Sequence, residues 1–351
     1  MRRAIINFIL ITLSIILTLC LILLSIMPYS HTISSYIGNF SLAFPYIFVS
    51  LILVLLVSLI RFSPWSLLIC ILGMACSIPN LLRTFSFSPK LETKNTENSI
   101  SLLSYNAHYF NFFESDNAMD YIKYCNSDVI CIQEFAVSNS LKSKFSLVAI
   151  KLALYKYPYS HIEFFSSNKH LKKGIATFSK YPIIKKEKLN IESNNHGAIN
   201  SYIKIKKDTL QVINCYLESN RLTIKDKDIS KWEKEKEREQ IKNIYNKLSD
   251  AANKRRKQAE KVISKKNNKL PSIVCGDMND VPSSFVYRRL RGDYNDAFLS
   301  LGKGLGNTFH EGIYNFRIDY IFFNNFVDGH LFSVDKINKS DHYPILFKFE
   351  L

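Results

Sequence analysis

Residues 272–284 read SIVCGDMNDVPSS: an apolar run typical of a β-strand stops at Gly276, and a polar turn containing Pro282 follows it. Asp277 and Asn279 stand two residues apart at the end of this run. Side chains at that spacing leave a strand on the same face. The stretch therefore predicts a strand that carries a carboxylate and a carboxamide to the rim of a sheet, where reactive groups remain accessible.

The chain divides into two parts of different composition. Residues 1–89 contain no Asp or Glu, and their only fixed positive charges are Arg2, Arg3, Arg61 and Arg83. Three apolar stretches occur there, at residues 4–27, 42–60 and 65–82, although Pro79 and Asn80 interrupt the third. Each approaches the length that crosses a bilayer. A cleaved signal peptide is the alternative for the first stretch, but no small-residue cleavage site follows it. We predict a membrane anchor of two or three transmembrane helices over residues 1–89.

The orientation of this anchor depends on few charges. Arg2 and Arg3 place the N-terminus inside, residues 28–41 carry no Lys or Arg and are expected outside, and Arg61 is expected inside. If the third stretch crosses, the C-terminal part lies outside the cytoplasm; if it only lies at the interface, that part is cytoplasmic. We favour three spans in a bacterial inner (plasma) membrane, with an extracytoplasmic C-terminal domain.

The basic charge is concentrated in one segment. The net charge is +16, and residues 225–269 hold 16 basic and 8 acidic residues. Such an excess attracts nucleic acid or anionic lipid. The alternative is a solvated helix face, because apolar residues recur at helical spacing from Ile241 to Ile263 with Lys, Arg and Glu on the other faces. We expect this long helix to pack on the outside of a sheet.

Residues 100–351 are predicted to form one domain, joined to the anchor by a polar linker at residues 90–99. Short apolar runs typical of strands alternate there with turns and a few helical segments, and several runs end in polar clusters. This pattern predicts an α+β fold, a four-layer α/β/β/α sandwich, preceded by transmembrane α-helices.

Seven short polar strings occur in this domain, most of them beside an apolar run. They are Ser104-Tyr105-Asn106, Ile132-Gln133-Glu134, Gly174-Ile175-Ala176-Thr177-Phe178-Ser179, Asn214-Cys215-Tyr216-Leu217, Gly276-Asp277-Met278-Asn279-Asp280, Arg317-Ile318-Asp319-Tyr320 and Ser340-Asp341-His342. In this order they resemble the endonuclease/exonuclease/phosphatase superfamily, which has the DNase I-like fold, from about Ser101 onward. The apolar stretches ahead of the domain are similar to those of membrane-anchored bacterial members.

The resemblance implies a metal-assisted hydrolysis of phosphoesters. Glu134 would supply a hard oxygen ligand for Mg²⁺, with Mn²⁺ as a substitute, because Mg²⁺ keeps several waters and binds few protein groups. Asn106 and Asp341 would complete the surroundings of the metal. The metal would act as a Lewis acid and stabilise the leaving group.

The remaining roles follow from the same resemblance. Asp277 would orient and deprotonate the attacking water, and Asn279 would hold a phosphate oxygen. His342 would contact the phosphate, while Asp319 would fix its tautomer and support its positive charge. Tyr216 stands where the superfamily often carries His. Its phenol can donate a hydrogen bond to phosphate but carries protons poorly near neutral pH, so we assign it as a phosphate ligand.

Two further residues are assigned to substrate binding, and several alternatives stay open. His108, two residues past Asn106, and Arg317 are the predicted substrate contacts, and His310 is not assigned. Asp277 and Asn279 also fit simple turn formers. Glu134 also fits a surface residue, and Asn106 or His108 a structural hydrogen-bonding group.

Three functions fit this pattern. The first is a Mg²⁺-dependent phosphodiesterase acting on nucleic acid, which the basic charge and Tyr216 favour slightly. The second changes the substrate to a phospholipid, a sphingomyelin head group or an inositol phosphate, which the membrane anchor favours. The third is an inactive membrane module that binds phosphate or a protein, although binding alone does not need the full set of polar residues.

Overall fold

The computed structural model describes residues 2–88, 98–112, 118–220, 222, 226, 237–312 and 314–351. Only Asn98 and Ser99 of the predicted linker fall within them. The chain forms two compact units. The first comprises Met1–Phe85, Arg221–Asn253 and Val281–Arg288, and the second comprises Ser86–Asn220, Lys254–Asp280 and Arg289–Leu351. Each unit is described separately.

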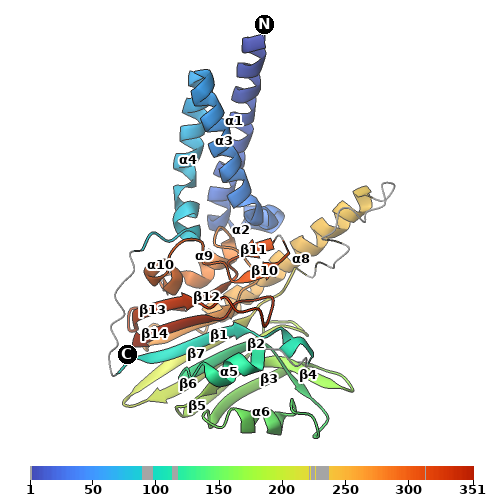
Figure 1. Cartoon of the computed structure of the whole chain (residues 1–351), viewed down its shortest axis with the longest axis vertical. Helices are drawn as coiled ribbons and strands as arrows, with labels where there is room; N and C mark the ends of the chain where they lie inside the picture. The colour runs from blue at the N-terminus through green and yellow to red at the C-terminus, as the bar shows by residue number, and fades with distance from the viewer. Residues whose placement is uncertain are drawn as a thin grey trace. The chain divides into compact units, whose positions relative to one another are not determined.

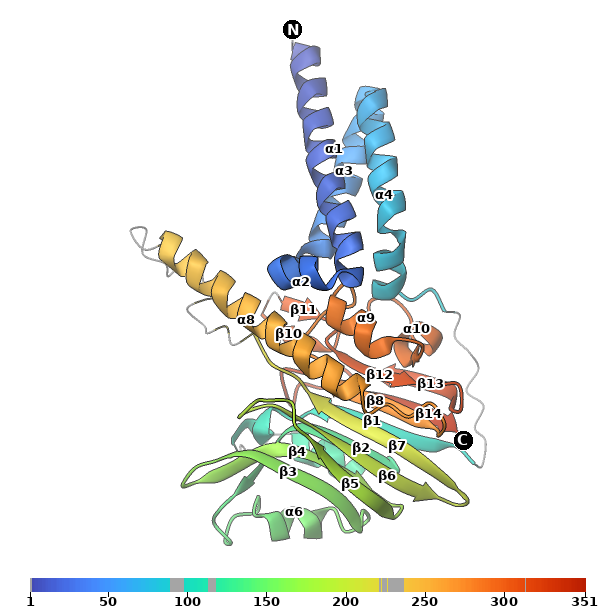
Figure 2. The same cartoon turned by 180° about the vertical axis from the view of Figure 1, so that it is seen from behind.

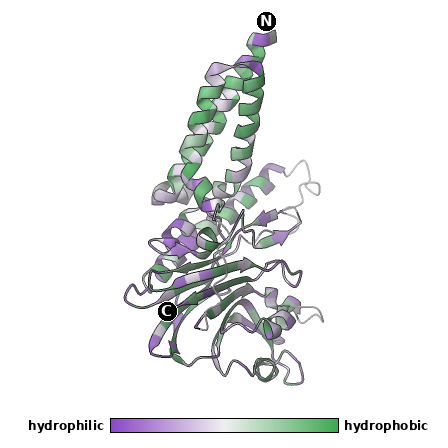
Figure 3. Cartoon of the chain, turned by 60° about the vertical axis from the view of Figure 1, so that its left-hand side comes forward, coloured by the Kyte–Doolittle hydropathy of each residue, from purple (hydrophilic) through white to green (hydrophobic). Residues whose placement is uncertain are grey.

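The first unit contains the apolar N-terminal helices. Their bounds are α1 (Arg2–Ile26), η1 (Met27–Tyr29), α2 (His31–Ile37), η2 (Gly38–Ala43), α3 (Phe44–Arg61) and α4 (Pro64–Thr84). The helices α1, α3 and α4 lie side by side and are apolar along most of their length (Figures 1 and 3). Three candidate membrane spans result, at Arg3–Tyr29, Phe40–Arg61 and Pro64–Thr84. Pro79 does not interrupt the third, because α4 continues through it.

Small and hydroxylated side chains pack these helices together. The Ser66 hydroxyl of α4 lies 2.6 Å from those of Ser14 in α1 and Ser58 in α3, and all three are buried. An added Cβ at Gly73 in α4 would lie 2.4 Å from Thr18 Oγ1 of α1, so the two helices approach closely at this point. Small residues and interhelical hydrogen bonds are typical of helix packing in membranes.

The second unit contains two six-stranded mixed sheets. The first has the order β13-β14-β1-β2-β4-β3 and the second β5-β6-β7-β8-β12-β9, with β10 and β11 as a separate hairpin. The strand bounds are β1 (Ile100–Asn106), β2 (Val129–Ser138), β3 (Tyr159–Ser167), β4 (Leu171–Ser179), β5 (Ile183–Leu189), β6 (Gly197–Ile205), β7 (Asp208–Tyr216), β8 (Ser272–Asp277), β9 (Asn295–Asp296), β10 (Phe309–Glu311), β11 (Tyr314–Phe316), β12 (Asp319–Phe323), β13 (Asp328–Val334) and β14 (Ile345–Glu350).

Alternation along the strands places the core between the two sheets. Leu102 of β1 and Phe347 of β14 face Val212 of β7 and Ile273 of β8 in one buried cluster. The neighbouring Leu103 turns to the other face of the first sheet. Strands buried on both faces give continuous apolar runs, which is how they appear in the sequence.

Helices cover the outer faces of the sheets (Figures 1 and 2). The remaining elements are η3 (His108–Phe112), α5 (Ala118–Tyr124), α6 (Leu147–Ala153), α8 (Glu237–Ile263), α9 (Phe285–Arg291) and α10 (Ala297–Leu301). Met119 of α5 and Ile150 of α6 pack on the outer face of the first sheet. The predicted α+β sandwich is therefore confirmed.

The long helix α8 has the predicted position, but its apolar stripe is not buried throughout. Ala259 and Val262 near its C-terminal end are fully buried, whereas Ile241 is 51% exposed and Tyr245 is 44% exposed. The predicted apolar stripe is therefore buried near the C-terminal end of α8 and exposed at Ile241 and Tyr245.

Candidate active site

The strand register of the second sheet brings three polar side chains to one edge. Asp277, the last residue of β8, is paired with Asp319 in antiparallel β12 and with Tyr216 in parallel β7. Their neighbours in each strand are apolar and buried, which fixes the register. Three strings that lie far apart in the sequence therefore end at the same place.

The first sheet contributes Asn106 and Glu134. Asn106 ends β1 and is paired with Gln133 in parallel β2. The β2–β4 pairing shifts between Ile132 and Phe135, and Glu134 within this bulge has φ 49°. A bulge re-aims the side chain that follows the regular ladder. The bulge explains why the Glu134 side chain is directed out of a strand whose other side chains are mostly buried.

Hydrogen bonds join the two sheets at this edge. The Asn106 side-chain amide donates to Asp277 Oδ2 over 2.9 Å and to Glu134 Oε1 over 3.2 Å. Beneath it, Gln133 Nε2 donates to Asn214 Oδ1 over 2.6 Å. Gln133 and Asn214 are fully buried, so their place in the polar strings has a structural reason: they hydrogen bond to each other across the core.

Asp277 is held by several donors in a buried position. Its side chain is 1% exposed and accepts hydrogen bonds from the Asn106 amide, the Asn279 main-chain N–H and the Asn279 side chain. Burial raises the pKa of Asp277 to about 8, His342 opposes the rise, and Asp319 adds to it. A carboxyl group with a pKa near neutrality is suited to take up a proton during a reaction.

His342 is the buried partner of two carboxylates. Its Nδ1 lies 2.8 Å from Asp319 Oδ2, and its Nε2 lies 3.9 Å from Asp277 Oδ2. Burial alone would lower the pKa of His342, but Asp319 and Asp277 raise it well above its usual range. The arrangement favours an imidazolium that stands beside Asp277 and is oriented by Asp319.

Asn279 and Tyr216 lie beside this cluster. Asn279 has φ 50° and donates from its side-chain amide to the Leu217 carbonyl over 2.9 Å and to Asp277. These two bonds use both amide hydrogens, so Asn279 positions Asp277 here, and donation to a phosphate would require one bond to be released. The Tyr216 hydroxyl donates to Glu134 Oε1 over 2.9 Å.

The oxygen groups beside Glu134 fit a divalent cation. Both hydrogen bonds described at Glu134 go to Oε1, which leaves Oε2 as a carboxylate ligand. Asp341 lies near Asn106, because the Ser340 hydroxyl is 2.8 Å from the Asn106 carbonyl and 3.2 Å from Asp341 Oδ1, and His108 Nδ1 is 3.1 Å from the same carboxylate oxygen. Burial would raise the pKa of Asp341, but the hydrogen bond from His108 and the charge of His342 hold this pKa below its usual range.

A second group, Asp277, Asp319 and His342, has ligand atoms within 4.8 Å of one another. His342 and Asp319 are hydrogen bonded to each other, Asp277 accepts a hydrogen bond from Asn106, and the two carboxylates raise the pKa of His342. The oxygen atoms around Glu134 therefore fit a hard divalent cation better than this second group does.

The geometry does not favour the predicted substrate contact of Arg317. This side chain is 3% exposed, and its guanidinium lies 2.7 Å from Asp296 Oδ2 and stacks over the ring of Phe298. Its place in a polar string is explained by this buried ion pair. His310 is stacked on Tyr343, with ring centroids 3.8 Å apart.

Sequence reasoning missed the turn that follows Asn106 and the part that Tyr109 plays in it. Residues His108, Tyr109, Phe110 and Asn111 all have left-handed backbone angles, with φ between 44° and 52°. The turn places Tyr109 against the hydroxyl of Tyr216, under the ammonium of Lys173, which is 4.3 Å from the ring centroid. No glycine marks this turn in the sequence, so it carries no recognisable signal.

A buried network of polar side chains supports the ends of β7 and β8. The ring of His196 packs against that of Tyr216 at 4.6 Å, and its Nδ1 lies 3.0 Å from Glu218. Arg255 of α8 donates to the Glu218 carbonyl over 2.9 Å and to Asp280 over 3.3 Å. Arg255 therefore ties the segment after Tyr216 to the segment after Asp277.

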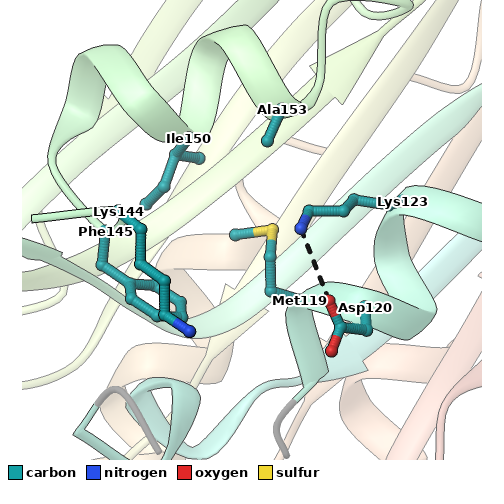
Figure 4. Close-up of a pocket in the computed structure, with 7 residues that line it drawn as sticks. All are labelled: Met119, Asp120, Lys123, Lys144, Phe145, Ile150 and Ala153. Atoms are coloured by element: carbon teal, nitrogen blue, oxygen red, sulfur yellow. Dashed lines mark hydrogen bonds and ion pairs between the residues drawn. The ribbon is translucent and has the colours of Figure 1, made fainter. Parts of the chain in front are cut away.

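One small pocket lies apart from this cluster. Its volume is about 70 Å³, and it is lined by Met119, Asp120, Lys123, Lys144, Phe145, Ile150 and Ala153 (Figure 4). Lys123 forms an ion pair with Asp120 at its edge. None of the polar strings contributes a residue to it.

Comparisons with known proteins agree with the fold. Residues 103–342 match the model of the endonuclease/exonuclease/phosphatase family. A family protein from Beutenbergia cavernae is 13% identical over 73% of this chain and 72% of its own, with a TM-score of 0.53. One from Leptotrichia buccalis is 18% identical over 72% of this chain and 100% of its own, with a TM-score of 0.51. No curated protein sequence matches. Since the family match covers more than half of the chain, the chain belongs to the endonuclease/exonuclease/phosphatase family, whose members are typically phosphoester hydrolases.

Proposed function

We propose that this protein is a membrane-anchored, Mg²⁺-dependent phosphodiesterase. The observation that carries the proposal is the position of Asp277. It is buried with a raised pKa, bonded to Asn106 from the opposite sheet, and adjacent to the His342–Asp319 pair. A binding module does not need a proton acceptor beside a charged imidazole, so this arrangement supports hydrolysis over the inactive alternative.

The chemistry follows from the protein groups. Asp277 takes the proton of a water whose oxygen bonds to phosphorus, while one P–O ester bond breaks and the departing oxygen takes a proton from solvent. His342 stabilises the negative charge on the phosphoryl oxygens, and Asp319 keeps its ring in place. Tyr216 donates to the phosphate or to Glu134. Glu134, Asn106 and Asp341 would hold Mg²⁺, which supplies charge neutralisation when bound.

The packing of the first unit supports three spans. Contacts between α1 and α4 run in the same direction along both helices: Ser14 meets Ser66, and the Asn80 side chain donates to the Leu24 carbonyl. The helices are therefore parallel, so if α1 crosses the membrane, α4 crosses it in the same direction. The chain after Thr84 then emerges opposite the N-terminus, as the positions of Arg2, Arg3 and Arg61 favour.

The test uses the purified full-length protein in nanodiscs with bis(p-nitrophenyl) phosphate and DNA oligonucleotides. We expect hydrolysis of the diester with Mg²⁺, none with EDTA, and none by Asp277→Ala. Equal rates for the wild type and a folded Asp277→Ala protein would refute the assigned base. Activity that is indifferent to EDTA would refute the metal.

A further inference from the structure

A polar cluster beside Tyr216 takes no part in the proposed chemistry. It consists of Ser193, His196 and Glu218, all in the second compact unit. His196 is 4% exposed and Glu218 is 1% exposed. His196 Nδ1 lies 3.0 Å from Glu218 Oε2, and the Ser193 hydroxyl donates to the same carboxylate oxygen over 3.1 Å. Because a buried carboxylate is costly unless it is paired, this cluster is a candidate for a role in the neighbouring site.

The hydrogen bonds exclude a proton relay through the cluster. Serine, histidine and an acidic residue also form acyl-transfer triads, in which the serine and the carboxylate occupy opposite ring nitrogens. Here the Ser193 hydroxyl lies 3.2 Å from Nδ1, the nitrogen that Glu218 already contacts. The other nitrogen, Nε2, accepts from the Ser219 main-chain N–H over 3.2 Å. A ring nitrogen that accepts carries no proton. His196 is therefore neutral with its proton on Nδ1, and the cluster fixes the ring instead of moving a proton.

The C-terminal part of α8 fixes Glu218 in turn. The Glu218 main-chain N–H donates to Gln258 Oε1 over 2.9 Å, and the Glu218 carbonyl accepts from Arg255 over 2.9 Å. The Lys254 ammonium lies 3.6 Å from Glu218 Oε1 and offsets its charge. Glu218 thus has a fixed main chain and a fixed carboxylate, and His196 is oriented through both of its ring nitrogens.

The His196 ring packs on the ring of Tyr216. The two ring centroids are 4.6 Å apart, with an angle of 43° between the planes. The Tyr216 hydroxyl donates to Glu134 Oε1 over 2.9 Å, and Asn106 donates to the same oxygen over 3.2 Å. Because a phenol is rigid, the position of its ring decides whether its hydroxyl reaches the carboxylate. His196 therefore controls a hydrogen bond in which it does not take part.

We propose that His196 is a positioning residue: its ring, oriented by Glu218, holds the Tyr216 hydroxyl on Glu134 Oε1. The other oxygen, Glu134 Oε2, is then kept in one orientation as the metal ligand. This role rests on the proposed function where it concerns the metal, whereas the contact between His196 and Tyr216 is independent of it. Without the ring, the phenol loses its support, and Glu134 loses one of the two bonds that fix it.

The test removes the ring but keeps a hydrogen bond to Glu218. His196→Gln retains an N–H donor for the carboxylate and has no ring to pack on Tyr216, while Tyr216→Phe removes only the hydroxyl. Full-length wild type, both single variants and the double variant are reconstituted in nanodiscs and unfolded with urea in EDTA. His161→Gln is the matched control, because His161 is equally buried, at 3% exposure, and its Nδ1 lies 2.9 Å from the Ser201 hydroxyl instead.

In the wild-type background, Tyr216→Phe should raise the unfolding constant by about tenfold, because it removes a hydrogen bond to a charged group. In His196→Gln the same change should raise the unfolding constant by only about twofold, since the hydroxyl no longer stays on Glu134. The full effect should persist in His161→Gln, although this variant is itself less stable. An undiminished effect of Tyr216→Phe in a folded His196→Gln protein would overturn the proposal.

Calorimetric titration with Mg²⁺ measures the consequence at Glu134 without turnover. His196→Gln and Tyr216→Phe should each raise the Kd for Mg²⁺, the double variant should raise it no further, and His161→Gln should leave it unchanged. An unchanged Kd in His196→Gln would overturn the link to Glu134. Failure of the wild type to bind Mg²⁺ would instead refute the metal of the proposed function, and the unfolding measurements in EDTA would still decide the role of His196.

Discussion

Replacing Asp319 by Asn tests whether the charge behind His342 matters for catalysis. The pair is buried, at 4% exposure for each residue, with a 2.8 Å contact between Nδ1 and Oδ2. The substitution keeps the shape and a hydrogen-bond acceptor but removes the charge that supports the imidazolium. Removing one partner of a buried ion pair costs about 3–5 kcal/mol. If about 3 kcal/mol of this appears in the transition state, kcat falls by roughly 10²-fold.

The assay measures kcat and KM on bis(p-nitrophenyl) phosphate together with the urea midpoint. Asp296→Asn is the matched control, because Asp296 forms an equally buried pair with Arg317 at 2.7 Å. Both variants should lose stability, but only Asp319→Asn should lose kcat once the folded fraction is taken into account. A folded Asp319→Asn protein that keeps the wild-type kcat would refute the role of this carboxylate.

Three further outcomes are expected. Glu134→Gln should raise the Mg²⁺ concentration needed for half-maximal activity, with an unchanged melting temperature; an identical Mg²⁺ titration would remove Glu134 from the metal site. Gly276→Ala should lower the free energy of unfolding by about 3 kcal/mol or more, because its Cβ would lie 2.0 Å from the Cys215 carbonyl oxygen at φ +124°. Gly304→Ala, at φ +81° with no atom within 4 Å, should cost only about 1 kcal/mol, and similar urea midpoints would contradict this reasoning. Burial lowers the pKa of His161 to about 4. Below pH 6.5, His161 therefore becomes protonated in the unfolded chain while it stays neutral in the folded chain. Stability should therefore fall by about 2 kcal/mol between pH 7 and pH 5, and an equal fall in His161→Gln would show that other groups cause it.

The sequence was most informative where a strand ends in a polar string. Asp277, Asp319 and Tyr216 were predicted separately, and the register of three strands explains why they meet. Apolar alternation decides which residues pair, and pairing decides which strand ends coincide. The fold and the family could therefore be inferred from local patterns, whereas the roles of these residues remain predictions.

The rest depends on long-range packing that no local pattern contains. In the sequence, Arg317 and Arg255 both stand near polar residues. In the structure, each is buried against a carboxylate. Nothing in their spacing separates them from solvated neighbours. Tyr109 adopts a left-handed conformation without a glycine nearby, so the turn that brings it to Tyr216 could not be anticipated.

The hydrogen bond between Asn106 and Asp277 joins residues 171 positions apart in the chain. Contacts of such long sequence separation form late, because closing a long loop loses chain entropy before packing compensates for it. Asp277, the proposed base, then has its donor from Asn106 only after both sheets have docked. Recovery of activity should consequently report the last step of refolding, after strand formation, and separately expressed halves of the domain should be inactive until they associate.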